Sequence, residues 1–189
     1  MRLHMKILYL HGLGSSGQSS TVQGLKAAGL EVVAPDYKPQ HFTESLQQLA
    51  AQVEAEQPDI LVGTSMGGYY ALKLNERYGL NTLVVNACFD PATLLRHYLR
   101  TPAMDYVTNQ PILFDQPMLD AFEAVKSSRN SRAQLRAIVG TRDDVINPDA
   151  QRQFFRQQGI EWHDVNWGHR VEDIPLLIQH IERVIQSPG

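Results

Sequence analysis

Short apolar runs alternate with amphipathic stretches along most of this chain. Six runs are apolar almost throughout and end at glycine, proline or polar residues, which predicts buried β-strands. The predicted strands are residues 6–10, 31–34, 59–63, 82–86, 135–140 and, more weakly, 161–165. Strands that are apolar on both faces belong to parallel sheets that helices cover on both sides. The pattern therefore predicts an α/β fold with a parallel sheet.

The amphipathic stretches between these runs have the spacing of helices. The clearest predicted helices are residues 44–56, 148–158 and 172–186. In the first, apolar residues recur at i, i+3, i+4 and i+7 from Leu46 to Val53, and Thr43 is the expected N-cap. The second follows the capping residue Asn147 and ends at Gly159. Each helix would cover one face of the sheet.

Residues 98–134 interrupt this alternation. They have no strong apolar period and contain Pro102, Pro111 and Pro117. A stretch of this length without regular structure is usually a lid or another functional excursion. Two full domains would be cramped in 189 residues, so we expect one domain, residues 1–189, with 98–134 as its lid segment.

Charge and composition exclude several functional classes. The 17 basic and 20 acidic residues give a net charge of −3, so no overall field attracts nucleic acid. No apolar run approaches the roughly 18 residues of a membrane-spanning helix, and the first is too short for a secretory signal. The single cysteine, Cys88, excludes an internal disulfide framework and a multi-cysteine zinc site. We therefore expect a cytoplasmic protein without nucleic-acid or membrane partners.

Two glycine motifs follow predicted strands and indicate different functions. Gly12, Gly14 and Gly17 match the GxGxxG fingerprint of dinucleotide-binding proteins. Asp36 even lies at about the distance where an acidic residue would bind the ribose. The motif is weak without further context, however, and His11 is an unusual residue before its first glycine.

The second motif, GTSMG at residues 63–67, matches the GxSxG nucleophile elbow. It follows an apolar strand and opens a predicted helix, which is the context that such an elbow requires. Gly63 and Gly67 leave room for a sharp turn that lifts the Ser65 hydroxyl above the sheet. There it meets a helix N-terminus, which stabilises negative charge. The competing interpretation is an ordinary glycine-rich turn with a capping serine.

A serine nucleophile needs a base and an acid, and in this arrangement the chain order is Ser, Asp or Glu, His. His169 lies in a loop between the last strand and the last helix, from which it can reach over the sheet. Asp143 directly follows the fifth strand and is the expected acid, with Asp144 and Asp90 as rivals. The predicted catalytic triad is therefore Ser65, Asp143 and His169.

The first glycine motif then has a second interpretation. Residues 11–14 resemble the HG-type loop that supplies a backbone N–H to an oxyanion hole. The expected donors are the backbone N–H groups of Leu13 and Met66. Glycines allow the backbone to approach an ester as closely as it would approach a nucleotide, so one motif imitates the other. The predicted triad supports only the hydrolase.

Several segments resemble the YqiA-like esterases, a small and nearly lidless branch of the α/β-hydrolase fold. They are residues 9–12 (YLHG), 65–71 (SMGGYYA), 84–86 (VVN), 94–95, 98–99, 140–145 and 168–169. The resemblance implies a reduced six-stranded parallel sheet in the order 2-1-3-4-5-6, with helices on both faces. It also implies an esterase or thioesterase with the predicted triad. Arg170 departs from the family, which would have a small residue after the histidine.

The sequence thus predicts a serine hydrolase that cleaves small carboxylic esters or thioesters through an acyl-serine, without a cofactor or a metal. The expected substrate contacts are His11, Gly12, Tyr69, Phe89 and Arg170. A basic group near the end of the lid segment would attract an acyl-CoA, or is simply a solvated face. It consists of Lys126, Arg129, Arg132 and Arg136. Two alternatives stay open: a non-catalytic binding protein with this fold, and a dinucleotide-binding protein that uses residues 12–17.

Overall fold

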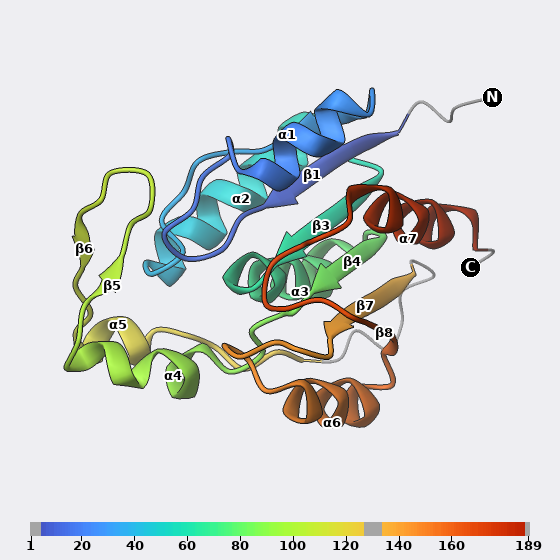
Figure 1. Ribbon diagram of the computed structural model, residues 1–189. Coiled ribbons are helices and arrows are strands. Elements are labelled where there is room, and N and C mark those ends of the chain that lie inside the picture. Colours follow the sequence, from blue (N-terminus) through green and yellow to red (C-terminus); the bar gives the residue numbers. More distant parts are fainter. Residues whose placement is uncertain (1–4, 127–133, 188–189) are drawn as a thin grey trace.

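A six-stranded sheet forms the centre of the protein (Figure 1). The structure is a computed structural model and describes residues 5–126 and 134–187. The strands are β1 (Lys6–Leu10), β2 (Glu31–Val33), β3 (Ile60–Thr64), β4 (Thr82–Val85), β7 (Leu135–Gly140) and β8 (Glu161–Val165). All neighbouring pairs are parallel, and the spatial order is β2-β1-β3-β4-β7-β8. Because β7 and β8 are the fifth and sixth strands of this sheet, the predicted fold and strand order are confirmed.

Helices cover both faces of the sheet (Figure 1). They are α1 (Ser20–Ala27), α2 (Phe42–Glu56), α3 (Met66–Tyr78), α6 (Pro148–Gln158) and α7 (Ile174–Gln186). In β1, Ile7 and Tyr9 pack in a core with α1 and α7, whereas Leu8 and Leu10 pack in a second core with α2, α3 and α6. This alternation explains why the strands are apolar throughout. Within the described residues, every helix is too short or too polar to cross a membrane.

Two of the predicted helices begin at other residues in the structure. The helix α2 begins at Phe42, so the expected cap Thr43 lies inside it. Phe42 is buried against the ring of Tyr70, and this packing extends the helix beyond the polar residue that marked its start. The helix α7 begins at Ile174 because Asp173 caps it, accepting a hydrogen bond from the N–H of Leu176 at 2.8 Å. The bounds of α6 agree with the prediction, including its cap and its final glycine.

The expected lid segment has regular structure of its own. The described elements from its vicinity are α4 (Pro91–Leu94), the 3₁₀ helix η1 (Leu95–Leu99), β5 (Ala103–Met104), β6 (Pro111–Ile112) and α5 (Gln116–Asp120). The strands β5 and β6 form an antiparallel hairpin that stands beside the carboxyl ends of the sheet strands (Figure 1). Elements of two to five residues are too short to produce an apolar period, which explains why the sequence pattern did not indicate them. Residues 127–133 lie outside the described residues.

Candidate active site

Ser65 lies in a sharp turn between β3 and α3, at φ 54° and ψ −120°. Non-glycine residues rarely adopt this conformation, and it persists only where the surrounding structure imposes it. Here the tight packing of the two flanking glycines, Gly63 and Gly67, imposes the conformation of Ser65. A Cβ atom on Gly63 would overlap the carbonyl oxygen of Gly67, and one on Gly67 would overlap the carbonyl oxygen of Leu10. The turn therefore has the compact backbone that the GxSxG pattern predicts.

A chain of hydrogen bonds links Ser65 to two distant loops. The Nε2 atom of His169 lies 3.0 Å from Ser65 Oγ, and its Nδ1 atom lies 2.9 Å from Asp143 Oδ1. An ionised carboxylate can only accept, so Nδ1 carries the proton and Nε2 is left to accept from the serine hydroxyl. The structure thus brings the three residues of the predicted triad together, in an arrangement that can remove the serine proton.

The Asp143 side chain is fully enclosed and its oxygens are well supplied with donors. Besides His169, the backbone N–H groups of Val145 and Ile146 donate to Oδ1 at 2.9 and 3.0 Å. The Nε2 amide of Gln151 donates to Oδ2 at 3.1 Å. Burial opposes ionisation, but the hydrogen bonds from His169 and the backbone outweigh it and lower the pKa of Asp143. The carboxylate therefore stays charged beside the imidazole.

The rival residues have other environments. Asp144 is exposed, and Asp90 caps α4 by accepting from the N–H of Thr93 at 3.2 Å. Of these three aspartates, Asp143 is therefore the strongest candidate for the acid because of its hydrogen bonds.

The Cys88 thiol is buried, and burial raises its pKa, which keeps it protonated and unreactive.

Asn86 holds the loops of Asp143 and His169 together, and sequence reasoning missed this role. It is fully buried at the end of β4 and has a φ of 46°. Its Oδ1 atom accepts from the N–H of Gly140 at 2.7 Å, just before the Asp143 loop. Its Nδ2 atom donates to the carbonyl oxygens of Gly168 and His169, each at 2.9 Å. A polar residue that ends an apolar strand was the available sequence signal.

The histidine loop is also held from its outer side. The Arg142 guanidinium donates to Glu172 at 2.7 Å and to the Asn166 side chain at 3.0 Å. Glu172 in turn accepts from the N–H of Gly168 at 2.6 Å. This backbone hydrogen bond, together with Arg142, outweighs desolvation and lowers the pKa of Glu172. The loop that carries His169 is therefore fixed on both sides.

The loop after β1 lies directly against Ser65. A Cβ atom on Gly12 would lie 3.3 Å from Ser65 Cβ and 3.8 Å from Ser65 Oγ. His11 supports this loop: its Nδ1 atom donates to the Gly12 carbonyl at 2.8 Å, and Tyr37 donates to the His11 carbonyl at 2.6 Å. Burial lowers the pKa of His11 and so favours its neutral form. Leu13 follows Gly12 in this loop, and Met66 begins α3 beside Ser65.

The same loop occupies the groups that a dinucleotide would need. The N–H of Gly17 donates to the carboxylate of Asp36 at 2.7 Å. A Cβ atom on Gly17 would overlap the carbonyl oxygen of Ala34, so this glycine closes the loop against β2. The acid that would bind a ribose thus binds the glycine loop itself. The GxGxxG spacing serves the packing of a loop that borders Ser65, and this favours the hydrolase interpretation.

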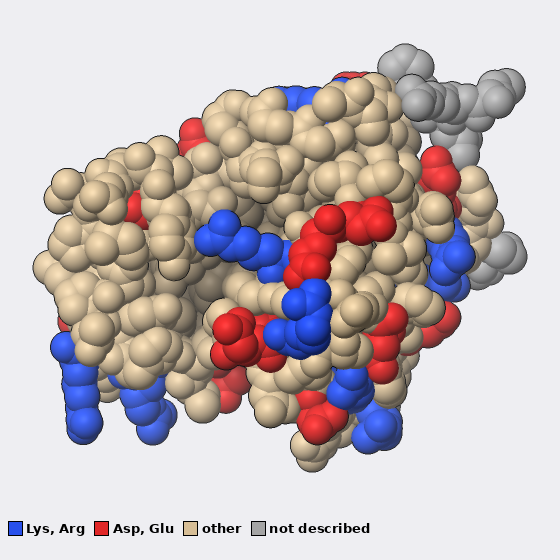
Figure 2. All heavy atoms as spheres, viewed as in Figure 1, with Lys and Arg blue, Asp and Glu red and all other residues tan. Residues whose placement is uncertain are grey.

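The other expected substrate contacts are placed differently. Tyr69 is fully buried, and its hydroxyl donates to the Glu123 carbonyl at 2.7 Å, so its ring belongs to the core. Phe89 is partly buried and stacks on Phe154, with ring centroids 4.7 Å apart. Arg170 is exposed beside His169. Figure 2 shows a hollow on the face of the molecule that is in view, with Lys or Arg and Asp or Glu side chains along it.

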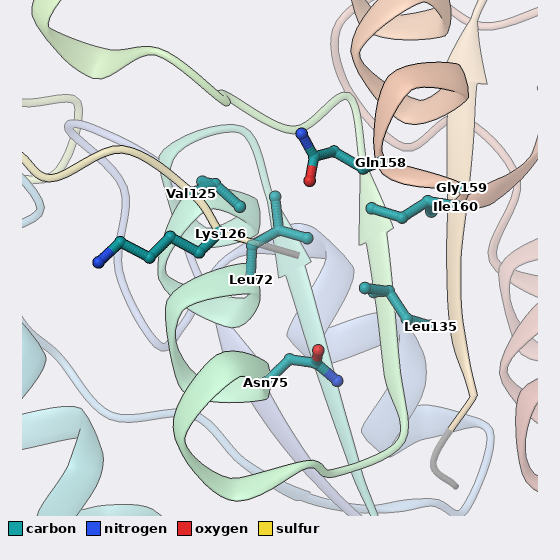
Figure 3. Close-up of a pocket in the computed structure, with 8 residues that line it drawn as sticks. All are labelled: Leu72, Asn75, Val125, Lys126, Leu135, Gln158, Gly159 and Ile160. Carbon is teal, nitrogen blue, oxygen red and sulfur yellow. The ribbon is translucent and has the colours of Figure 1, made fainter. Parts of the chain in front are cut away.

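A cavity of about 100 Å³ lies at the amino ends of the sheet strands, away from Ser65 (Figure 3). Its lining residues are Leu72, Asn75, Val125, Lys126, Leu135, Gln158, Gly159 and Ile160. Leu135 begins β7, whereas Asp143 follows the end of that strand. Two members of the predicted basic group lie at this end of the sheet: Lys126 lines the cavity, and Arg136 pairs with Glu161 at 3.5 Å. Arg129 and Arg132 lie outside the described residues. This placement favours a solvated basic face over a binding site for acyl-CoA beside Ser65.

A model of one protein family matches residues 6–186 of the chain, and its description is Uncharacterised protein family (UPF0227). The chain belongs to this family. UPF0227 is the YqiA family, so the resemblance that the sequence motifs indicated is confirmed.

Solved structures place this UPF0227 protein in the α/β-hydrolase fold. It is similar to the esterase domain of a Rhodothermus marinus protein, with a TM-score of 0.69 and 19% identity over 96% of this chain and 88% of that one. It is also similar to Est1E of Butyrivibrio proteoclasticus, which was solved with ferulic acid, with a TM-score of 0.71 and 10% identity over 95% and 87%. An esterase of Pyrococcus furiosus gives a TM-score of 0.62 and 15% identity over 95% and 78%. Identities this low show the fold alone.

Proposed function

We propose that this UPF0227 protein is a serine hydrolase that cleaves small carboxylic esters or thioesters. The observation that carries the proposal is the continuous hydrogen-bonded chain from Ser65 Oγ through His169 to Asp143. A nucleophile, a base and an orienting acid on three separate loops are the parts that acyl transfer requires. The strained conformation of Ser65 also supports the proposal, because such strain collects at functional sites.

The first half of the reaction forms an acyl-serine. Ser65 Oγ attacks the carbonyl carbon while His169 Nε2 takes the hydroxyl proton, and the carbonyl oxygen becomes an oxyanion. Asp143 stabilises the imidazolium that forms. When the intermediate collapses, His169 gives its proton to the departing alcohol or thiol and the acyl group remains on Ser65. Water then attacks the acyl-serine by the same steps, which releases the acid and restores the serine.

The oxyanion needs donors that are already in position. We assign this role to the backbone N–H groups of Leu13 and Met66, which flank Ser65 from the β1 loop and from the start of α3. The close packing of Gly12 on Ser65 supports this assignment. The loss of one such donor typically lowers the rate by about 10²–10³-fold. His11 holds this loop from behind, and we propose that Gly12, Phe89 and Arg170 border the substrate, with Tyr69 behind them in the core.

A covalent serine probe tests the proposal directly. The protein is incubated with a fluorophosphonate, and the labelled peptide is identified by mass spectrometry. We expect labelling at Ser65, and loss of both labelling and ester hydrolysis in Ser65→Ala with an unchanged thermal transition. A non-catalytic binding protein or a dinucleotide-binding protein would have no activated serine and would stay unlabelled. Full hydrolysis by the Ser65→Ala variant would overturn the proposal. An oxygen ester and a thioester of the same acid then compare the two substrate classes.

A further inference from the structure

Arg170 forms a contact that spans two parts of the candidate site. It directly follows His169, and its guanidinium lies over the ring of Tyr106, 5.5 Å from the ring centroid. Tyr106 belongs to the turn of the β5–β6 hairpin. The pair therefore joins the loop of the catalytic base to the hairpin beside the sheet.

The Tyr106 side of this contact is fixed to the β1 loop. The N–H of Tyr106 donates to the Gly14 carbonyl at 2.8 Å, which seats the hairpin on the loop that contains Gly12. Gly14 has a φ of 72°, and a Cβ atom there would lie 3.2 Å from Tyr106 Cδ2. Asp105 closes the hairpin turn by accepting from the N–H groups of Val107 and Thr108 at 2.8 and 2.9 Å. Tyr106 thus provides a platform whose backbone is already ordered.

The position of this pair relative to Ser65 follows from the contacts of Ser65. Its Oγ atom lies 3.0 Å from His169 Nε2, and a Cβ atom on Gly12 would lie 3.8 Å from it. Arg170 continues from His169, and Tyr106 is attached to the loop that contains Gly12. An ester whose carbonyl carbon is attacked by Ser65 must occupy the space between these two loops. The Arg170–Tyr106 pair, which connects them, therefore borders the substrate.

The charge of Arg170 is available to a ligand. Within residues 5–126 and 134–187, no carboxylate lies at ion-pair distance from its guanidinium, in contrast to Arg142, which pairs with Glu172 at 2.7 Å. Three acids in the neighbouring loops are already engaged: Glu172 with Arg142 and a backbone N–H, Asp143 with His169, and Asp105 with the hairpin turn. The face of an aromatic ring attracts a guanidinium. The N–H groups along the edge of the planar guanidinium then stay free to bind a carboxylate.

We propose that Arg170, held on Tyr106, binds a carboxylate of the substrate, so that the preferred esters carry a carboxylate a few bonds from the scissile bond. The corresponding compounds are half-esters of dicarboxylic acids, and esters in which the hydroxyl group of a hydroxy acid is acylated while its carboxylate stays free. The inference rests on the proposed esterase function and names its substrate class.

The experiment compares esters that differ in charge but hardly in shape. Monoethyl glutarate and ethyl glutaramate test a carboxylate on the acyl side, and the butyrate esters of glycolate and glycolamide test one on the alcohol side. Acid release gives kcat/KM for each, and the readout is the ratio of the charged to the uncharged ester. An exposed guanidinium–carboxylate contact corresponds to a ratio of up to about fivefold. We expect a ratio of about twofold to fivefold for one pair, and a smaller ratio at higher ionic strength because salt screens the contact.

The matched variants are Arg170→Gln and Arg156→Gln. Arg156 also lies over an aromatic ring, that of Trp162 at 5.6 Å, but belongs to α6. We expect Arg170→Gln to bring the ratio to about one, and Arg156→Gln to leave both kcat/KM values as in the wild type although it removes the same charge. Arg170→Lys retains the charge without the planar fork and should keep part of the preference.

Two results would count against these ideas in different ways. If the wild type hydrolyses charged and uncharged esters equally, or if Arg170→Gln keeps the wild-type ratio, the role of Arg170 is contradicted while the esterase function stands. If none of the four esters is hydrolysed and the fluorophosphonate leaves Ser65 unlabelled, the proposed function itself fails.

Discussion

The side-chain amide of Asn86 donates to the backbone carbonyl of His169 at 2.9 Å. The same side chain also binds the carbonyl of Gly168 and the N–H of Gly140, so one buried amide connects the end of β4 to the loops of Asp143 and His169. His169 must meet Ser65 on one side and Asp143 on the other. Asn86 fixes the backbone on which that double contact depends.

Replacement of Asn86 by alanine should therefore impair turnover more than it impairs folding. The change leaves one buried and two partly buried backbone groups without their partner and frees the His169 loop to shift. A displacement of about 1 Å at a catalytic group can cost about 10²-fold in rate. We expect kcat for an ester to fall by about that factor, with a matching loss in the rate at which a fluorophosphonate labels Ser65.

Asn75→Ala is the matched control. Asn75 is also buried, and its Nδ2 atom donates to the Leu80 carbonyl at 2.8 Å and to Thr82 Oγ1 at 3.3 Å, at the opposite end of β4. Both variants should lose stability, by about 1–3 kcal/mol for buried groups left unpaired. Only Asn86→Ala should lose kcat per folded molecule. Equal kcat losses in the two variants would mean that Asn86 acts on stability alone.

The neighbouring acids Asp143 and Asp144 provide a second comparison. In Asp143→Asn the side chain is no longer charged and can donate, so it no longer holds the proton of His169 on Nδ1. The same change in a serine protease triad lowers kcat by about 10⁴-fold, and we expect a loss of about 10³–10⁴-fold here. Asp144→Asn changes an exposed side chain and should leave the kinetics unaltered. A severe loss of kcat in Asp144→Asn, together with an active Asp143→Asn, would mean that Asp144 and not Asp143 is the acid.

The sequence pattern predicted the central sheet well because each buried strand leaves a continuous apolar run. It also indicated Ser65, Asp143 and His169 as candidates, since each lies in a segment that follows a predicted strand, and parallel strands end at one edge of the sheet. The β5–β6 hairpin escaped notice because each strand has two residues, too few for a period. Asn86 escaped because its partners are backbone groups up to 83 positions away, which no local pattern reveals.

Tyr69 illustrates a different difficulty. It follows the elbow closely, and the sequence analysis assigned it to the substrate. On a helix, however, a residue near the nucleophile in sequence can face either the site or the core. The ring of Tyr69 contacts Phe42 and Phe122, and its hydroxyl binds the backbone of Glu123. Its direction depends on these distant residues, so the motif alone could not supply it.

Gly67, the second glycine of the elbow, supports a prediction about stability. A Cβ atom on Gly67 would overlap the carbonyl oxygen of Leu10, a backbone atom at the end of β1, where this strand pairs with β3. We expect Gly67→Ala to destabilise the protein by about 3 kcal/mol or more, as severe overpacking does. Gly159→Ala is the comparison: the surrounding space is open, and the cost of about 1–2 kcal/mol comes from its φ of 68°. Thermal unfolding of both variants measures the difference, and equal stabilities would show that the turn can widen.

His180 has an environment that opposes protonation. It is 7% exposed on α7, and its Nε2 atom has no hydrogen-bond partner among the described residues. Its ring lies 4.8 Å from that of His163. Burial, followed by the charges of His163, Arg183 and Arg136, lowers its pKa to about 4. The native state therefore holds this imidazole in its neutral form at a pH where an unfolded chain would protonate it.

This difference makes the free energy of unfolding depend on pH. An unfolded histidine has a pKa of about 6.5, so between pH 6.5 and 4 the unfolded chain binds more protons than the native protein, and stability falls as the pH falls. In His180→Leu this contribution disappears. After allowance for solvent screening, the loss of stability between pH 7 and pH 5 should shrink by about 1 kcal/mol, or about 2–4 °C in Tm. His163→Gln removes the exposed neighbour but keeps the titrating group, so it should retain most of the pH dependence. Urea unfolding at the two pH values measures all three proteins, and an unchanged pH dependence in His180→Leu would exclude His180 as its source.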